Sequence, residues 1–226
     1  MRVVVTGGTG GLGAAVVEAF LARGADVHLP MMEAELPAQL PWRTDAKVHA
    51  VPRISLDDEA QVGAFYAALP ELWASIHLVG AFAMAPIEET TLAVFEKQWR
   101  LNGVTCFLGC REAVRAIRRT GAGGRIVNVA ARPVLAPAPR MTAYTAGKAV
   151  VAAITQTLAA EVLAEQILVN AVVPSIIDTP ANRASMPGAD HASWPTAAQL
   201  AETIAFLASP ANALTTGTLV PVYGRA

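Results

Sequence analysis

The chain has 226 residues, a length at which one α/β domain can bury most of its apolar surface and which leaves no room for a separate second domain. Lysine and arginine number 17 against 18 aspartates and glutamates, so the net charge of -1 provides no basic field for a nucleic acid or an anionic membrane. We therefore expect a single domain over residues 1–226 that acts on a small-molecule substrate, with no nucleic acid and no membrane as partner.

Hydrophobic residues make up 54% of the chain, more than in an average soluble protein, yet no apolar run reaches the roughly 18 residues of a membrane-spanning helix. The segment Met1–Thr6 is too short for a secretion signal, and we expect a cytoplasmic protein. The surplus of apolar residues favours additional burial in the interface of a homo-oligomer, either a dimer or a tetramer.

The first pattern along the chain is the glycine-rich stretch TGGTGGLG, Thr6–Gly13, between the apolar run Val3–Val5 and a helical pattern over Ala14–Arg23. A strand, a glycine-rich turn and a helix N-terminus in this order are typical of a site for a dinucleotide pyrophosphate. The unpaired N–H groups and the positive dipole end of the helix favour an anion, and glycine lets phosphates reach the backbone. A plain structural turn is the alternative interpretation of the glycines alone.

Strands and helices alternate along the rest of the chain. Further strands are predicted at 25–29, 47–51, 75–79, 125–129, 167–173 and 218–222, and helices at 57–69, 90–119, 142–163 and 196–208. We expect Asp57 or Asp58 to cap the first of these helices, a break near Asn102-Gly103 in the second, and a polar loop at 175–195. The alternation predicts a three-layer α/β fold, a doubly wound parallel sheet of about seven strands known as the Rossmann fold.

The cysteines and histidines do not have the spacing of metal ligands. Cys106 and Cys110 lie four residues apart in a helical pattern, so they share a face and are expected to pack rather than to form a disulfide or bind metal. The four histidines are scattered along the chain: His28, His49, His77 and His191. We therefore expect no metal site.

Tyr144 and Lys148 form the second chemically suggestive pattern. They lie four residues apart at the start of a predicted helix, so both side chains occupy one face. A tyrosine with an ordinary pKa near 10 is a poor proton donor or acceptor at neutral pH, and a neighbouring ammonium lowers that pKa by favouring the phenolate. The pair thus predicts a general acid or base, and a structural surface pair is the alternative for this spacing alone.

With these two motifs, the chain resembles the short-chain dehydrogenase/reductase family over essentially its whole length. TGGTGGLG matches the family's TGxxxGxG, and Tyr144 with Lys148 matches its YxxxK. Asn102 stands where the family has an asparagine that kinks the preceding helix and holds a water on a proton relay. The segment Asn170–Pro174 resembles the family's NAVxP strand end, and Thr216-Gly217 and Pro221-Val222 fit its closing strand.

The resemblance implies an NAD(P)H-dependent oxidoreductase, without a metal, that transfers hydride to a carbonyl or quinonoid small molecule. Tyr144 would donate the proton, Lys148 would lower the pKa of Tyr144 and bond the nicotinamide ribose, and Asn102 would complete the catalytic set. Thr179 would bond the nicotinamide amide. The residues implied to bind the cofactor are Gly7, Thr9, Gly10, Gly11, Leu12, Gly13, Met31, Gly80, Ala81, Tyr144, Lys148, Pro174, Ile177 and Thr179.

Several positions depart from the family's pattern. The catalytic serine thirteen residues before the tyrosine is replaced by Ala131, and Arg140 or Thr142 are candidates for a substitute donor. The ribose-binding aspartate after the second strand is missing, since Pro30–Met32 occupy that turn, and Gly10 stands where NADP users often carry a basic residue. The choice between NAD and NADP is therefore open.

One subgroup of the family shares the missing serine. The segment Asp178–Pro187, continuing to Asp190 and Ser193-Trp194, resembles dihydropteridine reductase, which reduces quinonoid dihydropterins. The ribose-binding aspartate of that subgroup is absent here, so a relative with another substrate is an equal alternative. A dinucleotide-binding sensor or scaffold that has lost catalysis is a further alternative, motivated by Ala131.

Overall fold

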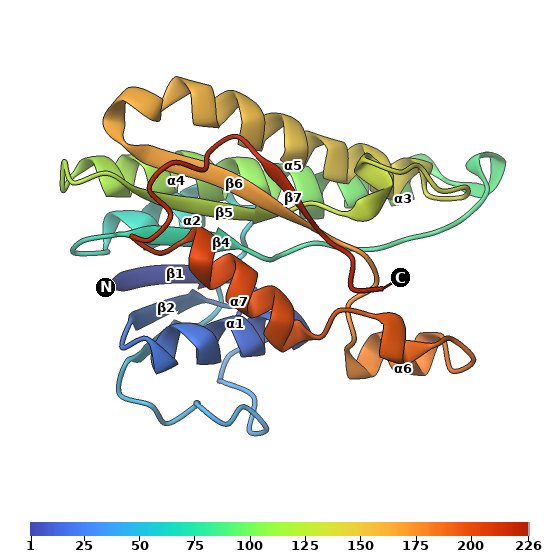
Figure 1. Cartoon of the computed structure of the whole chain (residues 1–226), viewed down its shortest axis with the longest axis horizontal. Coiled ribbons are helices and arrows are strands. Elements are labelled where there is room, and N and C mark those ends of the chain that lie inside the picture. The colour runs from blue at the N-terminus through green and yellow to red at the C-terminus, as the bar shows by residue number, and fades with distance from the viewer. Residues whose placement is uncertain (226) are drawn as a thin grey trace.

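A seven-stranded parallel sheet is the central layer of the protein, as seen in a computed structural model that describes residues 1–225 (Figure 1). The strand order is β3-β2-β1-β4-β5-β6-β7, so the direction of winding reverses between β1 and β4. This confirms the predicted doubly wound architecture, in which ligands bind outside the carboxyl ends of the strands at such a reversal. The strands are β1 (Arg2–Thr6), β2 (Asp26–Pro30), β3 (Val48–Val51), β4 (Ala74–His77), β5 (Gly124–Val129), β6 (Ile167–Pro174) and β7 (Leu219–Val222).

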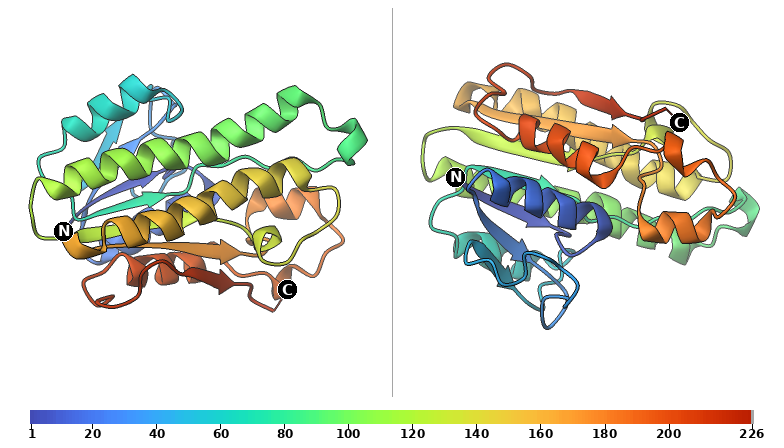
Figure 2. Two further views of the ribbon diagram at one scale, coloured as in Figure 1. Left: turned by 90° about the horizontal axis from the view of Figure 1, so that it is seen from above. Right: turned by 60° about the horizontal axis from the view of Figure 1, so that its bottom comes forward.

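Helices cover both faces of the sheet. They are α1 (Gly11–Ala22), α2 (Glu59–Ala67), α3 (Leu92–Gln98), α4 (Thr105–Arg118), α5 (Thr142–Glu161), α6 (Pro180–Ser185) and α7 (Ala197–Leu207). Figure 2 shows α4 and α5 side by side over one face, and α1 beside α7 on the other. None of the helices within residues 1–225 is both long and apolar enough to cross a membrane.

The alternation of side chains along the strands explains why the sheet has two cores. On β1, Val3 and Val5 pack into the core beneath α1 and α7, whereas Val4 packs into the core beneath α2, α4 and α5. Successive residues of a strand point to opposite faces, and both faces of this sheet are covered by helices. A continuous apolar run is therefore required, which is the pattern that predicted the strands.

The helix boundaries agree with the expected capping. Asp58 caps α2 by accepting from the Gln61 N–H, which confirms one of the two expected caps. Thr196 begins α7 with a capping box that includes Gln199. The polar loop after β6 differs from the expectation, because it contains α6, which begins with Pro180 after the cap residue Thr179.

The two helical patterns predicted on either side of Asn102-Gly103 are α3 and α4, but the break between them is a π-helical turn and not an end of the helix. The chain continues from α3 to α4 through one π-helical turn, Trp99–Val104. The amide nitrogen of the Asn102 side chain donates to the Gln98 carbonyl oxygen at 2.9 Å, and this is the acceptor that the backbone N–H of residue 102 would use in an α-helix. A side chain that takes this acceptor widens the helix without ending it.

Candidate active site

The glycine-rich turn between β1 and α1 is closely packed against itself. Gly7 has a φ of +70°, and a Cβ atom on Gly13 would lie only 2.0 Å from the Gly7 carbonyl oxygen. Gly10 is the N-cap of α1, and no side chain caps this helix. A Cβ on Gly10 would meet only one atom within 4 Å, so this side of the turn is open. The turn can therefore receive an anionic group at the unpaired N–H groups of α1.

An acidic side chain lies beside this turn although the sequence indicated none. The hydroxyl of Thr9 donates to the Glu33 carboxylate at 2.8 Å, and both residues follow the ends of adjacent strands. Met31, which was predicted to bind the cofactor, is 6% exposed, so its side chain belongs to the core. The sequence did not reveal Glu33 because it comes three residues after Pro30 rather than directly after the strand.

Tyr144 and Lys148 lie on α5 and line the same cavity. The ring of Phe82 packs edge-on against Tyr144 with 4.9 Å between centroids. The ammonium of Lys148 is buried and donates to the Val129 carbonyl oxygen at 2.8 Å. α5 thus directs both predicted catalytic side chains toward the carboxyl ends of β4 and β5.

The expected lowering of the Tyr144 pKa by Lys148 was wrong for this structure. Burial raises the pKa of the Tyr144 phenol to about 12, because the phenolate would lose its hydration. Burial also lowers the pKa of Lys148 to about 8. The phenol is therefore protonated at neutral pH, and the lysine is mostly charged.

Asn102 joins the π-helical turn to the loop that follows β4. Its Oδ1 accepts from the Ala81 N–H at 3.2 Å, and its Nδ2 donates to the Ala81 carbonyl oxygen at 3.0 Å. A Cβ on Gly80 would lie 2.6 Å from Asn102 Oδ1 and 3.0 Å from Lys148 Nζ. Since Asn102 is fully buried, its side chain positions Gly80 and Ala81 beside the lysine rather than facing the cavity itself.

A cavity of about 900 Å³ opens at the carboxyl ends of the strands. Seven residues predicted to bind the cofactor or to act in catalysis line it: Leu12, Gly80, Ala81, Tyr144, Lys148, Pro174 and Ile177. Its remaining wall is mostly apolar, and sequence reasoning missed most of that wall: Met84, Pro133, Pro137, Met141 and Ile176. No aspartate or glutamate of the described chain lines it.

The other predicted cofactor residues lie outside the cavity lining. Gly7, Thr9 and Gly10 form the turn before α1, and Gly11 and Gly13 lie in the first turn of this helix. Thr179 lies next to this turn, because a Cβ on Gly11 would meet its Cγ2 at 3.1 Å, and its hydroxyl accepts from the Asn182 N–H at the start of α6. The turn and the α6 loop therefore face each other.

The structure places no side-chain hydroxyl from residue 131 at the site, because the family's catalytic serine is replaced by Ala131. Ala131 is buried at the cavity wall. The two candidates for a substitute donor, Arg140 and Thr142, are exposed and do not line the cavity. The neighbouring Arg132 does line it, and the sequence offered no signal that distinguished this arginine from the others.

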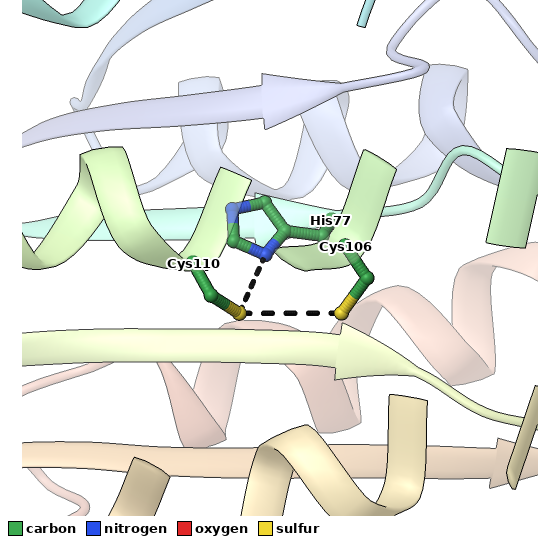
Figure 3. Close-up of side chains that lie close together, drawn as sticks. All are labelled: His77, Cys106 and Cys110. Atoms are coloured by element: carbon green, nitrogen blue, oxygen red, sulfur yellow. Dashed lines mark hydrogen bonds between the residues drawn. The ribbon is translucent and has the colours of Figure 1, made fainter. Parts of the chain in front are cut away.

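His77 lies with Cys106 and Cys110 in the core below the site (Figure 3). The two thiols are free, with 4.0 Å between the sulfur atoms, and the Cys110 sulfur is 3.6 Å from His77 Nδ1. Both ring nitrogens of His77 have partners, namely Asn128 Oδ1 at 2.8 Å and Ser75 Oγ at 2.9 Å. The cysteines share one buried face of α4 as predicted, but the fold brings His77 beside them. The three side chains thereby form a group of possible metal ligands, within a polar network from β4, β5 and α4, that their spacing in the sequence did not indicate.

Comparisons with known proteins agree with this geometry. A family model described as short chain dehydrogenase matches residues 1–189. The chain is 32% identical over 187 residues to 2-(R)-hydroxypropyl-CoM dehydrogenase of Xanthobacter autotrophicus, covering 78% of this chain and 74% of that protein. It is 30% identical over 250 residues to levodione reductase of Leifsonia aquatica, covering 98% and 92%. The structure of ElxO with NADP bound has the same fold, with a TM-score of 0.90 at 23% identity over 99% of this chain and 97% of that chain. The protein belongs to the short-chain dehydrogenase family.

Proposed function

We propose that the protein is an NAD(P)H-dependent oxidoreductase that reduces a carbonyl or quinonoid small molecule. The observation that carries this proposal is that a protonated phenol and a buried ammonium share one cavity with the loop after β4 and the first turn of α1. The two curated relatives described above are named a dehydrogenase and a reductase, which supports a redox reaction.

The residues of the turn fit a dinucleotide. The open side of Gly10 and the uncapped N-terminus of α1 would hold the pyrophosphate, and Thr179 has a hydroxyl hydrogen free to donate to the nicotinamide amide. The bound cofactor supplies hydride. Lys148 uses one N–H on Val129, which leaves two donors for ribose hydroxyls.

Tyr144 is the proton donor in this proposal. Because its pKa is about 12, the phenol holds its proton at neutral pH and can release it as negative charge develops on the substrate oxygen or ring nitrogen. Asn102 acts as a positioning residue, since its side chain contacts Ala81 and Gln98 and does not reach the cavity.

Glu33 favours NADH over NADPH. Its carboxylate, beside Thr9 of the glycine-rich turn, would accept a hydrogen bond from an adenosine ribose hydroxyl. The same negative charge would repel a 2′-phosphate.

Two other functions are alternatives to this proposal. Reduction of quinonoid dihydropterin is favoured by Ala131, because such a substrate does not need a serine to polarise an isolated ketone. A sensor or scaffold without catalysis is also motivated by Ala131, but the retention of Tyr144 and Lys148 in one cavity favours an enzyme.

A substrate screen with NADH and NADPH in parallel tests these functions. The screen contains ketones, quinones and quinonoid dihydropterin, and oxidation of the cofactor is followed by absorbance. We expect turnover that Tyr144→Phe lowers by roughly two to four orders of magnitude, as for loss of a general acid. Lys148→Met is assayed in the same screen, and Lys97→Met, which removes an exposed lysine, is its control. Unchanged turnover in Tyr144→Phe would remove the tyrosine from the mechanism, and failure to bind either cofactor by calorimetry would contradict both the enzyme and the sensor.

A further inference from the structure

Arg132 stands at the place where the family's catalytic serine is missing. It follows Ala131 at the end of β5 and begins a short 3-10 helix, Arg132–Val134. Arg132 is half-buried and is one of the residues that line the cavity beside Tyr144. The guanidinium lies 5.0 Å from the ring centroid of Tyr223, which follows β7. A cation stacked on an aromatic ring is held in one orientation, so its hydrogen-bond donors are arranged before a ligand arrives.

Within residues 1–225, this guanidinium forms neither an ion pair nor a hydrogen bond. Six other arginines pair with carboxylates: Arg23, Arg100, Arg111, Arg115, Arg118 and Arg183. The buried Arg125 instead donates to the Asn212 carbonyl oxygen. A partly buried cation without a counter-charge is costly, and a ligand anion would remove that cost.

The cavity provides no competing acid. Its lining contains two cations, Arg132 and Lys148, and the ammonium of Lys148 already donates to Val129. The walls around Arg132 are apolar, with Pro133, Ala136 and Pro137 from the following segment. These walls fit a hydrocarbon body, and the guanidinium fits two oxygens of one planar anion.

We propose that Arg132 is the anion-binding residue of the substrate site and that the substrate is an organic acid with an apolar body. A carboxylate matches the planar fork of the guanidinium, which donates two parallel hydrogen bonds to it, and a sulfonate is the related alternative. The reduced group lies elsewhere on the substrate, at Tyr144. This assignment rests on the proposed function for the reaction, but the binding of the anion does not depend on turnover.

Matched substrates separate anion binding from catalysis. The probes are 4-acetylbenzoate, the neutral acetophenone, and 4-acetylbenzenesulfonate for the related anion. In Arg132→Met we expect the KM for 4-acetylbenzoate to rise roughly 10- to 100-fold, as for loss of a hydrogen-bonded charge, with little change in kcat. The KM for acetophenone should stay within about twofold, since it lacks the charged group. Arg132→Lys should restore part of the affinity, because it keeps the charge without the fork.

The exposed Arg140→Met is the control for loss of one positive charge near the cavity. Equal changes in KM for the acid and the ketone would overturn the proposal, as would a fall in kcat for both with KM unchanged, which would place Arg132 at the reacting oxygen. Calorimetry with 4-acetylbenzoate in the presence of oxidised cofactor gives a readout without turnover. Binding that Arg132→Met abolishes would support the anion site even if no substrate were reduced, whereas binding that is unaffected by Arg132→Met, or absent in the wild type, would overturn it.

Discussion

Thr9 and Glu33 are joined by a hydrogen bond of 2.8 Å from the Thr9 hydroxyl to the Glu33 carboxylate. The bond places a negative charge beside the turn proposed to hold the cofactor. We predict that Glu33→Gln lowers the preference for NADH over NADPH by roughly fivefold, because removing one like charge near a phosphate is worth on the order of 1 kcal/mol at a surface.

The measurement is kcat/KM for NADH and for NADPH at fixed substrate and at two ionic strengths. The control is Glu35→Gln, which removes another exposed carboxylate two residues further along the loop. A preference that changes equally in both variants would contradict the role of Glu33. Salt should weaken the effect, because exposed charges are screened.

The lowered pKa of Lys148 predicts how the rate of reduction depends on pH. Burial lowers the pKa of Lys148 to about 8, whereas Tyr144 keeps its proton until about pH 12. The charged lysine is therefore the form present below pH 8, and activity should fall as the pH rises through that value. We expect this alkaline limb in kcat/KM and its displacement to higher pH in Lys148→Arg. A limb that stays at the same pH in Lys148→Arg would assign it to another group.

We predict opposite changes in stability when Gly13 and Gly63 are replaced by alanine. A Cβ on Gly13 would lie 2.0 Å from the Gly7 carbonyl oxygen, so Gly13→Ala should lower the free energy of unfolding by about 3 kcal/mol. Gly63 lies inside α2 with no atom within 4 Å of an added Cβ. Gly63→Ala should raise that free energy by about 0.5–1 kcal/mol, since alanine is the better helix former.

Urea unfolding followed by circular dichroism measures both changes. Gly63→Ala also serves as the matched control, because it adds the same methyl group in a helix. A Gly13→Ala variant as stable as the wild type would contradict this prediction, because it would show that the turn can relax around the added methyl group. In that case we expect the variant to bind the cofactor as tightly as the wild type.

The exposed faces of α3, the π-helical turn and α4 predict a homo-oligomer. They present the large apolar side chains Leu92, Phe95, Trp99 and Phe107 to solvent. The outer face of α4 also carries Arg115 and Arg118, so this face is not uniformly apolar. We expect light scattering to give the mass of a dimer or a tetramer and Phe107→Glu to reduce it. Val51→Glu on the edge strand β3 is the control, and a monomeric wild type would contradict the prediction.

The sequence predicted the elements of the fold because their signals are local. The apolar run of β1 and the glycines of the following turn need no distant residue to be recognised. The cap residue Asp58 is equally local. The π-helical turn was missed because it depends on one side-chain hydrogen bond, from Asn102 to Gln98, which has no periodic pattern.

The amino-acid sequence by itself predicted the doubly wound sheet, the glycine-rich turn that we propose as a dinucleotide site, and the joint presence of Tyr144 and Lys148 on one helix face. The tertiary structure decided the chemistry that these groups can perform. The pKa of Tyr144 follows from burial, which no spacing reveals, and the Thr9–Glu33 bond joins segments that follow different strands. Arg132 meets Tyr223 only because the fold brings the segments that follow β5 and β7 together, and Arg132 also lines the cavity. The charge environment and burial of these groups therefore depend on contacts between segments that are distant in the sequence.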